Sequence, residues 1–86
     1  MQTRIALVGI MVENLDSTER INGLLHDYGR FIVGRMGLPC RDRGLSIISV
    51  VMDAPMADIS TLSGRLGQLP GVNVKVIYNK EKGAEG

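Results

Sequence analysis

The chain has few of the residues that most catalytic and nucleic-acid-binding sites need. It contains no tryptophan, one phenylalanine, two tyrosines, one cysteine and one histidine among its 86 residues. A single cysteine excludes a disulfide within the chain and a metal site built from its own cysteines. His26 and Cys40 fall on a predicted helix end and a predicted loop, so they do not suggest a nucleophile with its base. Three aromatics are too few for the stacking platform of an RNA-binding sheet.

A strong charge of one sign and a long apolar segment are also missing. Ten Lys and Arg against nine Asp and Glu give a net charge of +1, which is too small to indicate binding to nucleic acid or to an anionic membrane. The apolar run from Ile5 to Val12 is too short to span a bilayer, and it has neither the charged start nor the cleavage site of a signal peptide. No phosphate-binding glycine motif follows a predicted strand. We therefore expect one small cytoplasmic domain.

Four segments have the composition of strands. Arg4 to Val12 and Leu45 to Met52 are apolar at nearly every position, which is typical of central strands covered on both faces. Arg30 to Leu38 is rich in glycine, and Pro39 should end its pairing before a hairpin turn at 41–44. Val72 to Asn79 alternates between apolar and polar residues except at Ile77, as an edge strand does.

Two segments have the period of helices. Asp16 and Glu19 have the spacing of a capping box, which predicts a helix from about Ser17 to a stop at Gly29. Pro55 marks the start of a second helix, which Pro70-Gly71 ends. The predicted buried stripes are Ile21, Leu24, Leu25 and Tyr28 on the first helix and Ile59, Leu62, Leu66 and Leu69 on the second.

The resulting β-α-β-β-α-β order predicts an α+β, ferredoxin-like fold, with a four-stranded antiparallel sheet and two helices on one face. We assign residues 1–79 to this domain and 80–86 to a disordered tail. The central strands carry apolar residues on both sides, so the sheet face away from the helices would be apolar and uncovered in a monomer. We expect a second copy or another protein to cover it.

Three arginines, three glycines and the only cysteine gather between residues 33 and 44. Arg35, Arg41 and Arg43 could hold an anion through their guanidinium groups and nearby backbone N–H groups. The alternative is a solvated basic hairpin that Asp42 partly neutralises. Composition alone leaves both readings open.

The same region resembles a known family. The segments GRMGLP (34–39), RDRGLSII (41–48) and LSGRLGQLPGVNVK (62–75) resemble the iron-only hydrogenase system regulators, small stand-alone proteins with an ACT-like fold. That fold is similar to the C-terminal domain of nickel-responsive repressors. The resemblance implies a regulatory, effector-binding module that is oligomeric through its sheets.

Two features of the nickel-responsive repressors have no counterpart here. Their nickel ligands include two histidines on the second strand and a cysteine after it, whereas this chain has Val33, Gly34 and Arg35 in that region and no histidine beside Cys40. We therefore predict no metal site and no cofactor. The sequence begins directly with the first predicted strand, so we expect no DNA-binding arm, no direct contact with nucleic acid, and a need for a regulatory protein partner.

The leading hypothesis is a homo-oligomeric sensor, a dimer or tetramer, that binds a small effector between subunits. The predicted ligand-binding residues are Asn14 and Asp16 in the loop after the first strand, and Gly34, Arg35 and Gly37 on the second strand. Amino acids, metals and small anions are the ligand classes to screen.

The alternative is an interaction module for hydrogenase maturation or regulatory proteins with no small-molecule ligand. An acylphosphatase-like enzyme ranks third, because the loop at 13–16 is acidic where an anion cradle should be basic, and we predict no catalytic residues.

Overall fold

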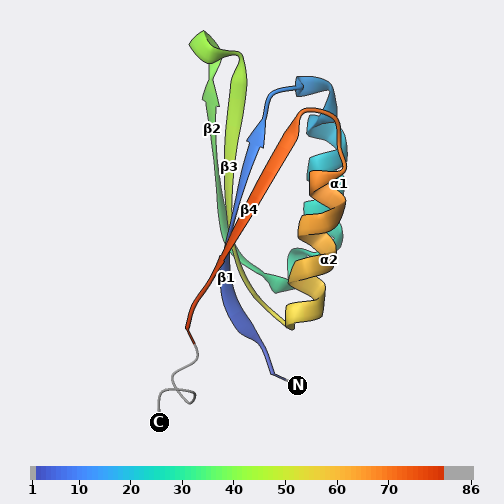
Figure 1. Ribbon diagram of the computed structural model, residues 1–86, viewed down its shortest axis with the longest axis vertical. Helices are drawn as coiled ribbons and strands as arrows, with labels where there is room; N and C mark the ends of the chain where they lie inside the picture. The colour runs from blue at the N-terminus through green and yellow to red at the C-terminus, as the bar shows by residue number, and fades with distance from the viewer. Residues whose placement is uncertain (1, 81–86) are drawn as a thin grey trace.

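The computed structural model describes residues 2–80 and places four strands and two α-helices in one sheet-and-helix arrangement (Figure 1). In chain order the elements are β1 Arg4–Val12, α1 Thr18–Asp27, β2 Ile32–Cys40, β3 Leu45–Ala54, α2 Met56–Gly67 and β4 Val72–Tyr78. Short 3₁₀ turns precede α1 and β2 and form the tip of the β2–β3 hairpin. The predicted disordered tail falls on residues that lie, apart from Lys80, outside this range.

The sheet has the order β2-β3-β1-β4, and all three pairings are antiparallel. Both helices lie on the same face, and the β2–β3 hairpin extends beyond them at one end of the molecule (Figure 1). The prediction of an α+β ferredoxin-like fold is confirmed, including β1 and β3 as the central strands.

The core lies between the sheet and the helices. Alternate residues of β1 and β3 point into it, and the helices add their apolar stripes. The fully buried large side chains are Val8, Ile10, Val12, Ile21, Leu25, Val50, Met52, Ile59, Leu62 and Leu66. Leu24, Tyr28 and Leu69, which the stripes predict as buried, are only partly buried at the edges of this core.

A tight contact joins the loop after β1 to the loop before β4. Gly71 has a positive φ of 67°, and a Cβ placed on it would lie 2.6 Å from the Asn14 Cβ. The Glu13 N–H donates to the Gly71 carbonyl at 2.7 Å, and the Ser17 hydroxyl donates to the Pro70 carbonyl at 2.8 Å. Glycine is required at position 71 because its neighbours leave no room for a side chain.

The predicted capping box is wrong. Ser17, not Asp16, is the residue before α1, and no side chain caps its first turn. Asn14 takes the capping role one turn earlier, where its side-chain oxygen accepts from the Asp16 N–H at 2.9 Å. A 3₁₀ turn at Leu15–Ser17 delays the start of the helix to Thr18. Asp16 therefore lies within this turn, and its carboxylate does not cap the N–H groups of the first turn of α1.

The second strand also differs from its prediction in three ways. A 3₁₀ turn at Gly29–Phe31 delays its start to Ile32, and a bulge at Val33 breaks the alternation of faces. As a result Ile32 faces the helices while Gly34 faces away from them. Pro39 does not end the pairing, since it lies opposite Ser46. An edge strand pairs on one side only, so it tolerates a proline whose missing N–H would have faced solvent.

Candidate functional site

The sheet face away from the helices is largely apolar and uncovered; its polar members are Ser49, Asp53, Asn73 and Lys75. We call it the open sheet face; its large apolar side chains come from all four strands. Those that are exposed are Ile5 (43%), Leu7 (40%), Met11 (46%), Met36 (59%), Leu38 (53%) and Ile77 (65%), and Ile47 and Val51 between them are half-buried. Single exposed apolar residues are ordinary on protein surfaces, whereas a continuous patch across a sheet marks an interaction site.

The register explains how this face is assembled. In neighbouring strands Leu7 pairs with Val51 on one side and Ile77 on the other, so the three side chains stand in one row. Ile77, which interrupts the alternation of β4 in the sequence, therefore belongs to this patch. In the next row Gly9 lies between Ser49 and Lys75, and a hollow of about 220 Å³ forms over the missing side chain.

Asn14 and Asp16, the predicted ligand residues of the first loop, are exposed at the end of β1. Asn14 is held in place by Gly71 and by its bond to the Asp16 N–H. No hydrogen bond to the Asp16 carboxylate is present among residues 2–80, so this carboxylate remains available to a ligand.

Gly34, Arg35 and Gly37, the other predicted ligand residues, lie on the edge strand β2. The bulge turns Arg35 to the helix side, where its guanidinium donates to the Asn22 Oδ1 of α1 at 3.0 Å. A Cβ on Gly34 or Gly37 would meet nothing within 4 Å. Contacts among the described residues therefore do not require either glycine.

One chain does not bring these two groups together. β3 separates β1 from β2, so the first loop lies about 10 Å across the sheet from the second strand. Arg35 is level with Val8 in the middle of β1, whereas Asn14 comes after the last residue of that strand. A ligand that contacts both groups needs the loop of one chain and the strand of another.

The hairpin tip forms a separate small hollow. Pro39, Cys40, Arg41, Asp42 and Arg43 line about 400 Å³ there, and the Cys40 thiol is free and partly exposed. Within the part of the chain that the structure describes, no three His, Cys, Asp or Glu side chains lie together as a metal site would need. Neither reading of the three arginines is tested by this arrangement.

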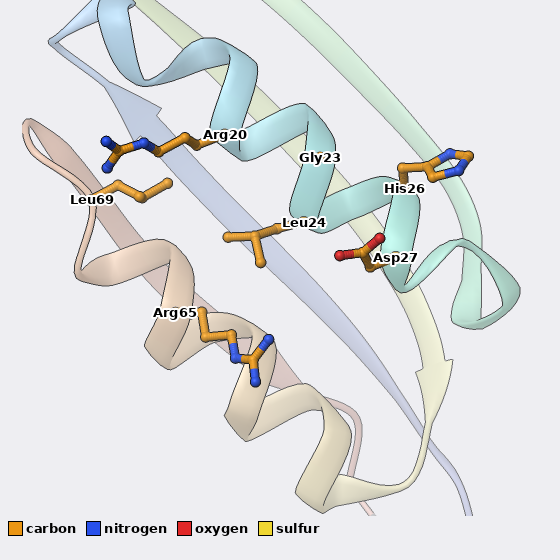
Figure 2. Close-up of a pocket in the computed structure, with 7 residues that line it drawn as sticks. All are labelled: Arg20, Gly23, Leu24, His26, Asp27, Arg65 and Leu69. Atoms are coloured by element: carbon orange, nitrogen blue, oxygen red, sulfur yellow. The ribbon is translucent and has the colours of Figure 1, made fainter.

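A larger hollow lies between the two helices, and the sequence does not reveal it. It measures about 570 Å³ and is lined by Arg20, Gly23, Leu24, His26, Asp27, Arg65 and Leu69 (Figure 2). The helical spacing of Arg20, Leu24 and Asp27 puts them on one line along α1. Only the packing of α2 beside that line turns it into the wall of a groove.

The fold and these surfaces define a small ferredoxin-like α+β domain of the ACT-like type, with one face of its sheet open. Residues 4–76 match the family model described as "TM1266-like: Iron-only hydrogenase system regulator, putative". The chain belongs to this family, and the match covers all of the elements described above except the end of β4, which includes Ile77.

Solved structures agree with this assignment. The uncharacterized protein TM1266 from Thermotoga maritima is 34% identical, with a TM-score of 0.88 over 92% of this chain and 100% of that one. The C-terminal domain of the MgtC protein from Mycobacterium tuberculosis has a TM-score of 0.67 at 14% identity, over 92% of this chain and 90% of that one, and shares the fold alone. No curated protein matches the chain.

No helix within residues 2–80 is both long enough and apolar enough to cross a membrane.

Proposed function

We propose that this protein is a cytoplasmic, non-enzymatic regulatory module that works as a homo-oligomer and binds a small effector between its subunits. The family match supports a role in the iron-only hydrogenase system. The observation that carries the oligomer is the open sheet face, where six large apolar side chains are at least 40% exposed in the single chain.

A second copy is the simplest cover for this face. A domain of this size buries only a little over ~60% of its extended surface, so it has little apolar area to leave in water. The same patch on two copies can pack against itself around a two-fold axis. The hollow over Gly9 offers such a copy a place for a protruding side chain.

The effector site is proposed at Asn14 and Asp16 of one subunit and Gly34, Arg35 and Gly37 of another. Three features support it: the Asp16 carboxylate has no hydrogen bond among residues 2–80, nothing lies within 4 Å of a Cβ placed on Gly34 or Gly37, and Arg35 of the same strand presents a guanidinium next to Asn22 of α1. Because one chain holds the two groups apart, effector binding and assembly should depend on each other.

A thermal-shift screen tests the effector. Amino acids, metal ions and small anions are added one at a time, and a ligand at 100 times its dissociation constant should stabilise the protein by about 2.7 kcal/mol. Asp16→Asn and Arg35→Gln should remove the response, whereas Arg43→Gln at the hairpin tip should keep it. If no compound shifts the melting temperature, effector binding is wrong, although the oligomer would stand.

The open sheet face also favours a second candidate, an interaction module for hydrogenase maturation or regulatory proteins that binds no small ligand. An Ile47→Asp variant separates the two functions, because Ile47 lies on the open face while its neighbour Ile48 is buried against the helices. If Ile47→Asp leaves the chain's self-association unchanged but abolishes binding of a purified maturation protein, the second candidate replaces the first.

In either function, contact with DNA would come from a partner. This proposal rests on the even charge balance and on the scarcity of aromatic residues. A gel-shift assay with the purified protein and hydrogenase promoter DNA should show no complex at physiological salt, and a specific complex would overturn this part of the proposal.

A further inference from the structure

We propose that the groove between α1 and α2 binds a small amphiphilic anion, an organic carboxylate or similar acid with a short apolar body. The groove lies on the helix layer, on the opposite side of the sheet from the open sheet face (Figures 1 and 2). It shares no lining residue with the effector site proposed between subunits, so either site can fail without the other.

The charge of the groove favours an anion. Two arginines, Arg20 on α1 and Arg65 on α2, stand against one carboxylate, Asp27. Neither guanidinium has an ion pair or side-chain hydrogen bond with any residue in the range 2–80. In Figure 2 Arg20 lies at one end of the groove beside Leu69, and Asp27 lies toward the other end. An acidic group is thus best placed toward the Arg20 end, away from the carboxylate.

The floor of the groove favours an apolar body. Leu24 and Leu69 are both partly buried; Leu24 lies between Arg20 and Asp27, and Leu69 lies beside Arg20 (Figure 2). An aliphatic or aromatic group over these leucines would remove apolar surface from water while its acidic end lies toward Arg20, within the positive field of both arginines.

Gly23 gives an independent indication that the space is used. It lies inside α1, where glycine is less favourable than alanine, and a Cβ on it would meet nothing within 4 Å. No contact among the described residues explains why a side chain is missing here. A bound molecule would explain it, because a side chain at this position would occupy the groove.

The dimensions favour a small molecule over a docked protein. The hollow is a shallow groove open to solvent, and its volume of about 570 Å³ lies within the range of about 300–1,000 Å³ that is usual for small-ligand sites. Its lining mixes two cations with a short apolar floor and has no continuous apolar ridge to pack a second helix. We therefore commit to a small anion and treat a second copy of the chain as an outcome of the test.

Octanoate is a suitable probe, with octanamide as its uncharged counterpart. Titrating octanoate into ¹⁵N-labelled protein should shift the amide resonances of Gly23, Leu24, Arg65 and Leu69 with one common dissociation constant. Octanamide should bind at least about threefold more weakly, because it lacks the charge that the arginines contact. Shifts confined to the open sheet face, or equal binding of the two compounds, would overturn the proposal.

Variants sharpen the test. Arg20→Gln and Arg65→Gln should each weaken octanoate binding about three- to tenfold, whereas Arg43→Gln on the hairpin should leave it unchanged. Asp27→Asn should strengthen binding, since it removes the repelling carboxylate. Gly23→Leu should fill the groove and abolish the shifts while circular dichroism shows a folded helix.

Two further results would count against the proposal. If Asp27→Asn weakens octanoate binding, the carboxylate contacts the ligand and the assignment of an anion is wrong. If the groove resonances shift with protein concentration in the absence of octanoate, a second copy occupies the groove instead.

Discussion

Ile47 and Ile48 are the same residue type on the same strand, yet they belong to opposite faces of the sheet. Ile48 is 7% exposed and packs among the helix stripes, whereas Ile47 is half-buried on the open sheet face beside Leu38 and Met11. β1 repeats the contrast, since Ile10 is fully buried and Met11 is 46% exposed. Both faces carry large apolar side chains, but the open face also carries Ser49, Asp53 and Lys75, and the chain itself covers only the helix-side face.

This difference separates two roles of apolar residues. Those on the helix side stabilise the fold of one chain, because each is already removed from water. Those on the open side contribute only when something else covers them. Substitutions on the two faces should therefore affect different quantities: the free energy of unfolding on one side and association on the other.

The largest expected effect is on the helix side. Ile48→Ala should lower the free energy of unfolding by about 3–4 kcal/mol, because it leaves a cavity among packed neighbours. Urea denaturation at low protein concentration measures this change. Ile47→Ala is the matched control and should cost less than about 1 kcal/mol under the same conditions. If the two substitutions lower the unfolding free energy of the monomer equally, the two faces of the sheet do not differ in their contribution to stability.

Gly71→Ala should come next, with a loss of about 2–3 kcal/mol, because it combines a left-handed backbone with a Cβ only 2.6 Å from the Asn14 Cβ. Gly44 has the same φ of 67° but open space around it, so Gly44→Ala should cost only about 1 kcal/mol. Thermal unfolding of the two variants compares them. A larger loss of stability for Gly44→Ala than for Gly71→Ala would show that the close contact between Gly71 and Asn14 contributes little to the stability of the fold.

Gly23→Ala should act in the opposite direction. The substitution should raise the free energy of unfolding by about 0.5–1 kcal/mol, since alanine favours the helix and meets no neighbour within 4 Å. Thermal denaturation without added ligand is the measurement. A destabilised Gly23→Ala variant would mean that the groove between the helices is tighter than its contacts indicate.

The fold could be predicted because its signals are local. The continuous apolar runs of β1 and β3 distinguish central from edge strands, and the helical period of Ile59, Leu62 and Leu66 places α2 on the sheet. Apart from Pro39, whose pairing an edge strand tolerates, the errors in the element bounds lie where a 3₁₀ turn or a bulge inserts a residue. At Val33 and at Leu15–Ser17 the backbone departs from its regular period, and neither departure has a distinct sequence signal.

The sites were less predictable for a different reason. The apolar composition of both sides of β1 and β3 predicts an uncovered face, but it does not say whether Ile47 or Ile48 lies on it. The structure puts Ile47 there and buries Ile48 against the helices. The groove needs α1 and α2 packed side by side, since Arg20 and Arg65, which both line it, are far apart in the chain. The residues of the predicted effector site lie apart in one chain, and only an assembly can test whether they meet.

The most direct test of the central claim, that a second copy covers the open sheet face, is sedimentation velocity of the unmodified protein and of Ile47→Asp. The account predicts a dimer or tetramer for the unmodified protein and a monomer for the variant, because an unpaired carboxylate in the covered face is costly. The monomeric variant should keep its unfolding free energy at low concentration within about 0.5 kcal/mol. An unmodified protein that sediments as a monomer at concentrations up to about 1 mM would contradict the account. Its self-association would then have a dissociation constant above about 1 mM, which is too weak to cover the open sheet face.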